Sequence, residues 1–321
     1  MRRRLKAAGA AALIAALAAG CGGGDGGGGA PAATVRVALD FTPNAAHAGI
    51  FAATRGGLDR ARNVRLVVRQ PTASTDSLKL LLSGRAELAV VDVHDLGLAR
   101  ERGEPVVGVG ALVQRPLASV IARGRVARPR DLEGGRVGVT GVPSDEAVLR
   151  AVVEGDGGDY SRVRRVTIGF SAIPSLAARK VDAATAFWNV EGVALRARGV
   201  RTREFRVDDF GAPSYPELVL ITTRAELRSH RPEIRRALAA LADGTRAALR
   251  EPGPAVAAVA RAAQADRRLV AAELEAIRPA LSPPLTLDRR ALAAWGAFAV
   301  RFGILHRPPD LARAFDTTLA P

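Results

Sequence analysis

The chain has 321 residues, and its 47 Lys and Arg against 32 Asp and Glu give a formal net charge of +15 at pH 7. Lysine occurs only at positions 6, 79 and 180, so nearly all of this charge is arginine. No basic run is interleaved with aromatic residues, so we expect no nucleic-acid partner, although a basic face toward anionic lipid headgroups stays open. The single cysteine, Cys21, excludes an internal disulfide.

The N-terminus predicts export and anchoring. Three arginines at positions 2–4 and Lys6 precede an apolar stretch, residues 7–17, that is too short to span a bilayer. The following Leu-Ala-Ala-Gly-Cys21 resembles a bacterial lipobox, with alanine at the position where leucine is usual. We therefore expect a signal peptide over 1–20, lipidation of Cys21 and a Gly-rich tether over 21–33. The alternative is a plain secretory signal with an incidental cysteine. Either way the protein is expected to be extracytoplasmic.

Beyond the tether, strand-like and helical segments alternate, which predicts an α/β fold with mixed, mostly parallel sheets flanked by helices. Helices are expected over 45–53, 74–84, 95–102 and 145–154, and over most of the chain after 222. Strands are expected over 34–39, 64–68, 88–92, 106–110, 118–122, 136–140, 166–168, 183–187, 204–207 and 218–222.

The order of these segments predicts two lobes that the chain visits in turn. The first lobe is expected to combine 34–117 with 220–321, and the second to comprise 118–219. Two crossings between lobes form a hinge, and the cleft between them is the expected ligand site.

The polar residues after the first strand are candidates for that site. Asp40, Phe41, Asn44 and His47 supply a carboxylate, a ring, an amide and an imidazole where a strand gives way to a helix. Asp92 ends another strand. Asp40, Asn44 and Asp92 could equally cap the following helices, and His47 could either face a ligand or support the turn.

Several motifs together resemble one family. They are Asp40-Phe-Thr-Pro-Asn44 with His47-Ala-Gly-Ile50, Leu88-Ala-Val-Val-Asp92, Asp131-Leu-Glu-Gly-Gly135, Pro143-Ser-Asp-Glu-Ala-Val-Leu149, Ala186-Phe-Trp-Asn-Val-Glu-Gly192 and Tyr215-Pro-Glu-Leu-Val-Leu220. The chain from 34 to about 225 resembles the substrate-binding proteins of bacterial ABC importers for thiamine precursors. These are related to alkylsulfonate, taurine and nitrate binding proteins, and also resemble fungal hydroxymethylpyrimidine phosphate synthase.

The resemblance implies a type II periplasmic binding protein, or Venus flytrap, that binds a 4-amino-2-methylpyrimidine and delivers it to an ABC permease. Such a ring needs aromatic faces and a carboxylate at its polar edge. Trp188 and Tyr215 are the candidate rings, although both could be packing residues, and Phe187 is expected in the core. Glu191 could pair with the amino edge or lie at the surface. Glu217 could reach the cleft or brace the hinge.

Three alternatives remain open. The synthase is disfavoured, because its resemblance implies a pyridoxal-bearing lysine, iron-linked chemistry and a cysteine-rich motif, whereas the body here has two lysines and no cysteine. A sulfonate or taurine binder is the closer rival, but Asp145 and Glu146 open the helix whose start would suit an anion. A lipoprotein that only mediates interactions is the third. We expect no enzyme activity, no cofactor, no metal site and a monomer.

Overall fold

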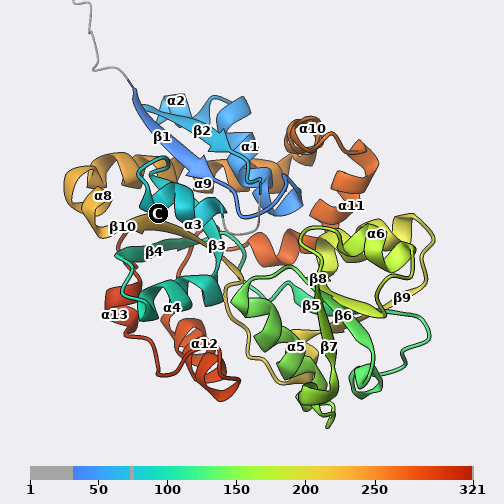
Figure 1. Cartoon of the computed structure of the whole chain (residues 1–321). Coiled ribbons are helices and arrows are strands. Elements are labelled where there is room, and N and C mark those ends of the chain that lie inside the picture. The colour runs from blue at the N-terminus through green and yellow to red at the C-terminus, as the bar shows by residue number, and fades with distance from the viewer. Residues whose placement is uncertain (1–31, 73–75, 320–321) are drawn as a thin grey trace, which may run out of the picture. The chain divides into compact units, whose positions relative to one another are not determined.

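The computed structural model describes residues 32–72 and 76–319 (Figure 1). The expected signal peptide over 1–20, Cys21 and the tether as far as residue 31 lie outside this range, as do residues 74 and 75 at the start of the second expected helix. No helix among the described residues combines the length and apolar character needed to cross a membrane.

Two five-stranded sheets organise the described part of the chain. The first has the order β2-β1-β3-β10-β4 and the second β7-β6-β8-β5-β9. The first sheet contains β1 (Ala33–Ala38), β2 (Val64–Arg69), β3 (Leu88–Asp92), β4 (Val106–Ala111) and β10 (Leu218–Thr223). The second contains β5 (Ala118–Arg123), β6 (Arg136–Val139), β7 (Arg164–Thr167), β8 (Ala183–Phe187) and β9 (Thr202–Arg206). Every strand expected from the sequence is present, with ends shifted by two residues at most.

The sheets are mixed, and four of the five strands in each run in the same direction, which confirms the expected mixed, mostly parallel arrangement. Of the described strand pairs, four are parallel and four antiparallel. Each sheet contains one reversed strand, β10 in the first and β5 in the second, and each has two antiparallel neighbours. The chain passes from the first sheet into the second at β5 and returns to the first sheet at β10. Each of these strands begins at the side of its sheet where the neighbouring strands end, so it must run opposite to them.

Helices cover both faces of each sheet. They are α1 (Ala48–Arg55), α2 (Leu58–Ala61), α3 (Asp76–Leu82), α4 (Val93–Glu101), α5 (Pro143–Gly155), α6 (Ala172–Ala177), α7 (Val193–Ala197), α8 (Arg224–Ser229), α9 (Arg231–Arg250), α10 (Pro252–Ala263), α11 (Arg267–Ile277), α12 (Arg289–Arg301) and α13 (Leu311–Ala314). Short 3-10 turns lie at η1 (Ala45–His47), η2 (Pro129–Leu132), η3 (Tyr160–Arg162), η5 (Val207–Phe210) and η6 (Arg278–Leu281), and a π-helical turn at η4 (Trp188–Gly192).

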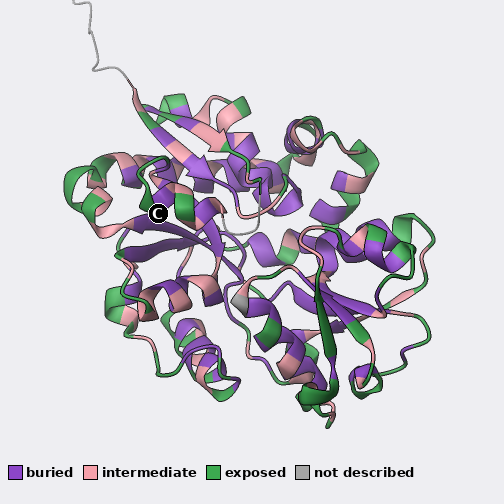
Figure 2. Cartoon of the chain, in the orientation of Figure 1, coloured by how far each residue is buried: buried purple, intermediate pink, exposed green. Residues whose placement is uncertain are grey.

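The alternation of side chains along β3 shows how the two faces are filled. Val90 packs in the cluster that contains residues of α1, α9, α10 and α11, whereas its neighbours Ala89 and Val91 pack in the cluster that contains α4 and α12. Because both faces are covered, the strand is an unbroken apolar run, as its sequence predicted. Figure 2 shows the buried residues concentrated in the sheets and on the inner sides of the helices.

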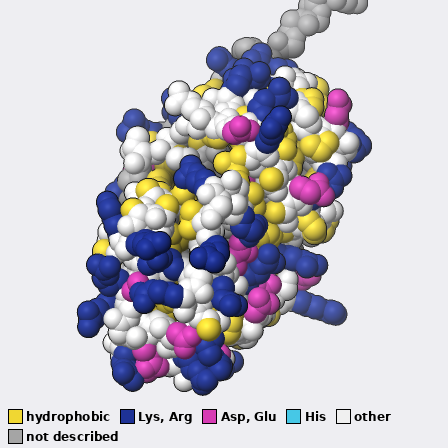
Figure 3. Space-filling model, turned by 90° about the vertical axis from the view of Figure 1, so that its right-hand side faces the viewer, with side chains coloured by type: hydrophobic (Ala, Val, Ile, Leu, Met, Phe, Trp, Pro, Cys, Tyr) yellow, Lys and Arg dark blue, Asp and Glu magenta, His cyan; other side chains and the backbone are white. Residues whose placement is uncertain are grey.

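Lys and Arg side chains are spread over the face in Figure 3, with acidic side chains between them. Many arginines in the described part of the chain pair with carboxylates, as in Arg62–Asp243 at 2.7 Å and Arg162–Glu133 at 2.7 Å. The distribution fits a solvated basic surface.

Candidate functional site

A cavity of about 450 Å³ lies between the two sheets. Forward strands contribute the residues just past their ends, such as Asp40 after β1 and Thr140 after β6. The reversed strands contribute their first residues, Leu218 of β10 and Ala118 of β5. The strand topology therefore brings the ends of both sheets together around one space, which is where α/β proteins place ligands.

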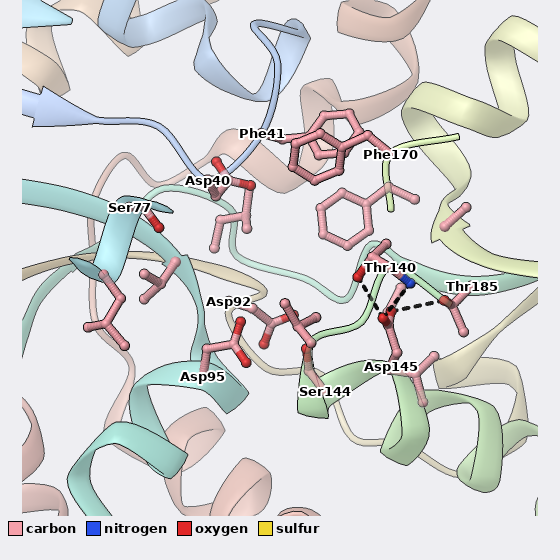
Figure 4. Close-up of a pocket in the computed structure, with 18 of the residues that line it drawn as sticks. Asp40, Phe41, Ser77, Asp92, Asp95, Thr140, Ser144, Asp145, Phe170 and Thr185 are labelled. Atoms are coloured by element: carbon pink, nitrogen blue, oxygen red, sulfur yellow. Dashed lines mark hydrogen bonds between the residues drawn. The ribbon is translucent and has the colours of Figure 1, made fainter. Parts of the chain in front are cut away.

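The wall of the cavity is acidic. The acidic residues that line it are Asp40, Asp92, Asp95, Glu104, Asp145 and Glu191. The four aspartates are labelled in Figure 4. The cavity also touches Lys79 and Arg102, but both are exposed residues. Burial raises the pKa of Asp95 well above its ordinary value, and the nearby Asp92 raises it further. A space with buried carboxyls favours a cation or a polar neutral group over an anion.

Phenyl rings form the apolar part of the wall. Phe41 and Phe170 lie edge to face, with ring centroids 4.2 Å apart and an interplanar angle of 64°. Phe187 also lines the cavity. All three are only half-buried, so they keep ring surface available to a flat ligand.

The residues after β1 divide into wall and support. His47 is fully buried and its Nε2 lies 2.8 Å from Asp40 Oδ1. The Nδ1 of the same ring accepts the backbone N–H of Asn44, so the imidazole carries its proton on Nε2 and donates it to Asp40. Asn44 caps η1 by accepting from Ala46 N, and its amide donates to Thr42 O. Asp40 and Phe41 thus face the cavity, while Asn44 and His47 hold the turn that orients them.

Asp92 in the cavity wall and Glu217 behind it form a pair of neighbouring carboxyls. Asp92 accepts from His94 N at 2.7 Å and lines the cavity. Burial raises the pKa of both groups, that of Glu217 to about 7, and their mutual repulsion raises that of Asp92 further. Burial and the charge of Glu217 therefore both favour the protonated form of Asp92.

Glu217 connects the two passages of the chain between the sheets. Its Oε2 accepts from the backbone N–H groups of Leu117 at 2.7 Å and Ala118 at 3.3 Å, where the first passage enters β5. Glu217 itself lies on the second passage, one residue before β10, and is fully buried. Of the two roles considered for Glu217, the structure places it at the crossings and outside the cavity wall.

Glu191 lies on η4 and lines the cavity. Its Oε2 accepts from Phe187 N at 3.1 Å, and only 7% of the residue is exposed. Burial raises the pKa of Glu191 to about 7. At neutral pH this carboxyl can therefore donate a proton to a ring nitrogen or accept a hydrogen bond from an amino group.

Trp188 and Tyr215 are not among the residues that line the cavity. The Trp188 Nε1–H donates to Pro116 O at 3.2 Å, and the guanidinium of Arg206 lies 4.1 Å from the ring centroid. Tyr215 is fully buried, and its hydroxyl lies 3.3 Å from the Nε2 of His94. In this structure both rings therefore have packing roles, and the rings at the cavity are Phe41, Phe170 and Phe187.

Asp145, the third residue of α5, fills a cradle of hydrogen-bond donors at the cavity wall. Its Oδ2 accepts from Thr140 N at 2.7 Å, Thr140 Oγ1 at 2.6 Å and Gly141 N at 3.0 Å. Its Oδ1 accepts from Thr185 Oγ1 at 2.9 Å. Burial raises the pKa of Asp145, and these hydrogen bonds offset part of that rise.

Sequence reasoning missed several lining residues. Phe170 follows the end of one predicted strand and Thr140 is the last residue of another, so the rule that selected Asp40 and Asp92 could have found them. Asp95 begins a predicted helix and Thr185 lies inside a predicted strand, so neither carries a comparable signal. Among the described residues no group of three or more His, Cys, Asp or Glu could hold a metal ion.

Two facing mixed sheets with a cavity between their strand ends define a periplasmic binding protein fold. The alkanesulfonate-binding protein of Xanthomonas axonopodis pv. citri, solved with bound MOPS, superposes with a TM-score of 0.72 and 18% identity over 90% of this chain and 99% of that one. At that identity the likeness shows the fold alone.

Residues 44–255 match the NMT1/THI5-like family, and the chain belongs to that family. It is 36% identical to a formylaminopyrimidine-binding protein of Halalkalibacterium halodurans over 195 residues, or 60% of this chain and 59% of the relative. It is 25% identical to a 4-amino-5-hydroxymethyl-2-methylpyrimidine phosphate synthase of Uromyces fabae over 269 residues, or 78% of this chain and 73% of that enzyme.

Proposed function

We propose that this chain is the extracytoplasmic solute-binding component of an ABC importer and that it binds a 4-amino-2-methylpyrimidine in the cavity between its sheets. The observation that carries the proposal is the presence of half-buried phenyl rings and the Glu191 carboxyl in the lining of one cavity. The family and the relative named for formylaminopyrimidine support the same ligand class.

The polar edge of an aminopyrimidine matches Glu191. Such a ring has an acceptor nitrogen next to an amino donor, and a carboxylic acid offers a donor and an acceptor with the same spacing. Because the pKa of Glu191 is about 7, either partner can hold the shared proton near neutral pH. Asp40, fixed by His47, is the second carboxylate available to an amino group.

The ring faces match the phenyl groups. Phe41 and Phe170 come from different sheets, since Phe41 follows β1 and Phe170 follows β7. A ligand against both rings therefore contacts both sheets. Such a ligand stabilises the arrangement in which the sheets face each other closely, because it binds that arrangement better than an open one. We propose that the two sheets with their helices form the two lobes, and that the crossings held by Glu217 form the hinge.

The binding role is favoured over catalysis. The enzyme-named relative is more distant than the binding protein, and the body of this chain has only Lys79 and Lys180 and no cysteine. Lys79 touches the cavity, but it is an exposed residue. We propose that the protein is not an enzyme, that it works as a monomer, and that lipidated Cys21 holds it near the permease at the membrane.

Calorimetry tests the ligand. Purified protein is titrated with formylaminopyrimidine, hydroxymethylpyrimidine, taurine and methanesulfonate in a sulfonate-free buffer. We expect micromolar or tighter binding of at least one pyrimidine and no heat from the sulfonates. Clear binding of a sulfonate with none of a pyrimidine would show that the ligand class is wrong.

A further inference from the structure

The carboxylate of Asp145 occupies a cradle that could hold a free anion. Two backbone N–H groups and the hydroxyls of Thr140 and Thr185 converge on its two oxygens, at 2.6 to 3.0 Å. Two amide donors and two hydroxyls are the donor types with which proteins bind sulfonates, phosphates and carboxylates.

The cradle is built by two strands. Thr140 and Gly141 follow β6, and Thr185 lies on β8. Gly141 has φ +98°, a conformation that L side chains rarely adopt, and a Cβ there would meet Thr167 Cγ2 at 3.1 Å. That backbone turn aims the Gly141 N–H at the same carboxylate oxygen as the Thr140 N–H. The donors would therefore keep their directions without the aspartate.

The cradle opens on the cavity. Thr140, Asp145 and Thr185 all line it, and Figure 4 shows the three side chains joined by hydrogen bonds at one side of the space. Asp145 is only 9% exposed, so its side chain takes the place that an incoming anion would need.

We propose that Asp145 is a specificity-determining residue that acts as a built-in anion, filling the donor cradle and closing the cavity to sulfonates and other small anions. The proposal rests on the proposed function and deepens it, because it explains how this cavity selects a neutral or cationic ring. An anionic solute must both displace a hydrogen-bonded side chain and approach its negative charge. A ligand that brings an amino group avoids both penalties.

The test removes the built-in anion. Asp145→Ala leaves the Thr140, Gly141 and Thr185 donors in place and opens space for an anion. Full-length protein is titrated with methanesulfonate in a Tris buffer free of sulfonates, and its melting temperature is followed as methanesulfonate is added. We expect the variant to bind methanesulfonate at least tenfold more tightly than the unsubstituted protein and to melt at a temperature that rises with the anion.

Two control variants separate the cradle from simple charge removal. Asp95→Ala removes a carboxyl from the same cavity without freeing backbone donors, and Glu146→Ala removes an exposed carboxyl from the same helix turn. Neither should gain anion binding. An equal gain in Asp95→Ala would overturn the proposal, since the effect would then be one of general charge.

A second variant tests the proposal in case Asp145→Ala folds poorly. Asp145→Ser, with a shorter polar side chain, is measured in the same way, and rescue of either variant's melting temperature by methanesulfonate counts as binding. Rejection of methanesulfonate by both variants overturns the proposal. The unsubstituted protein's response to pyrimidines tests the proposed function separately, since gain of an anion by the variant requires no pyrimidine binding.

Discussion

Replacing Glu191 with glutamine should stabilise the unliganded protein and weaken ligand binding. The side chains have nearly the same shape, and the glutamine Oε1 can still accept from Phe187 N as the carboxylate does. What changes is the ionisable group, which is buried and lines the cavity. The two expected effects have opposite signs, so a general loss of structure cannot produce both.

The stability effect follows from the pKa. Burial raises the pKa of Glu191 from 4.5 to about 7. Below pH 4.5 the group is protonated in both the folded and the unfolded protein and contributes no penalty. Between pH 4.5 and 7 the unfolded chain releases the proton that the folded protein keeps, so the free energy of unfolding falls as pH rises. At 1.36 kcal/mol per pKa unit, the full penalty above pH 7 is about 3 kcal/mol.

The expected loss of pyrimidine affinity follows because glutamine cannot share a proton with the ligand as the Glu191 carboxyl can. A hydrogen bond to a charged group contributes about 1.5 to 3 kcal/mol, which corresponds to a weakening of roughly 10- to 150-fold in affinity. The assay combines urea unfolding of the unliganded protein at pH 5 and pH 8 with calorimetry against the pyrimidine. We expect the variant's gain in unfolding free energy to be several times larger at pH 8 than at pH 5.

The matched control is Glu146→Gln. Glu146 carries the same chemistry on an exposed helix turn, 4.0 Å from Arg165, and should change neither quantity appreciably. A Glu191→Gln protein that unfolds as easily as the original at pH 8 would refute the burial argument. An unchanged pyrimidine affinity would remove Glu191 from the ligand's contacts.

Three further changes separate other roles. Phe170→Ala should weaken pyrimidine binding by roughly two- to tenfold because the ligand loses a ring contact. Trp188→Phe should change the affinity by less than about threefold. A larger loss for Trp188→Phe than for Phe170→Ala in calorimetry would show that Trp188 contacts the ligand. Glu217→Ala should lower the free energy of unfolding by about 2 to 4 kcal/mol, because two buried N–H groups lose their acceptor, and Glu217→Gln should lower it less; equal losses in urea unfolding would contradict this. Cys21→Ser should move the protein from the membrane fraction to the soluble fraction of the producing cells, and unchanged fractionation would exclude the lipid anchor.

Most strands were predictable because they are short, largely apolar runs between turn signals. Leu88–Asp92 and Leu218–Thr223 are examples in which sequence and structure agree to within a residue. Strand direction was not predictable in the same way. Nothing in the residues of β5 or β10 differs from those of a forward strand, since both are buried on two faces. Their reversal follows only from where the chain crosses between sheets, which is a property of the whole topology.

The candidate site was predictable as a location but not as a set of contacts. The rule that polar residues at strand ends face a cleft selected Asp40, Phe41 and Asp92, and all three line the cavity. It also selected Asn44 and His47, whose polar atoms are used within their own turn. The residues that line the cavity and the residues that cap their own turn carry the same kinds of polar groups, because the side chains that bind ligands also cap helices and turns.

Whether a polar side chain is free to contact a ligand depends on how many unpaired N–H and hydroxyl donors lie near it. Several of these donors come from residues far away in the sequence. Glu217 turns from the cavity because the N–H groups of Leu117 and Ala118, about 100 residues earlier, reach its oxygens. Asp145 lies along the wall because a hydroxyl 40 residues away and two N–H groups beside β6 converge there. A carboxylate with such partners is a poor ligand contact, whereas Glu191, with fewer donors and a pKa near 7, keeps its capacity to exchange a proton. The function of each acid in this cavity therefore depends on how many donors the fold has already brought to it.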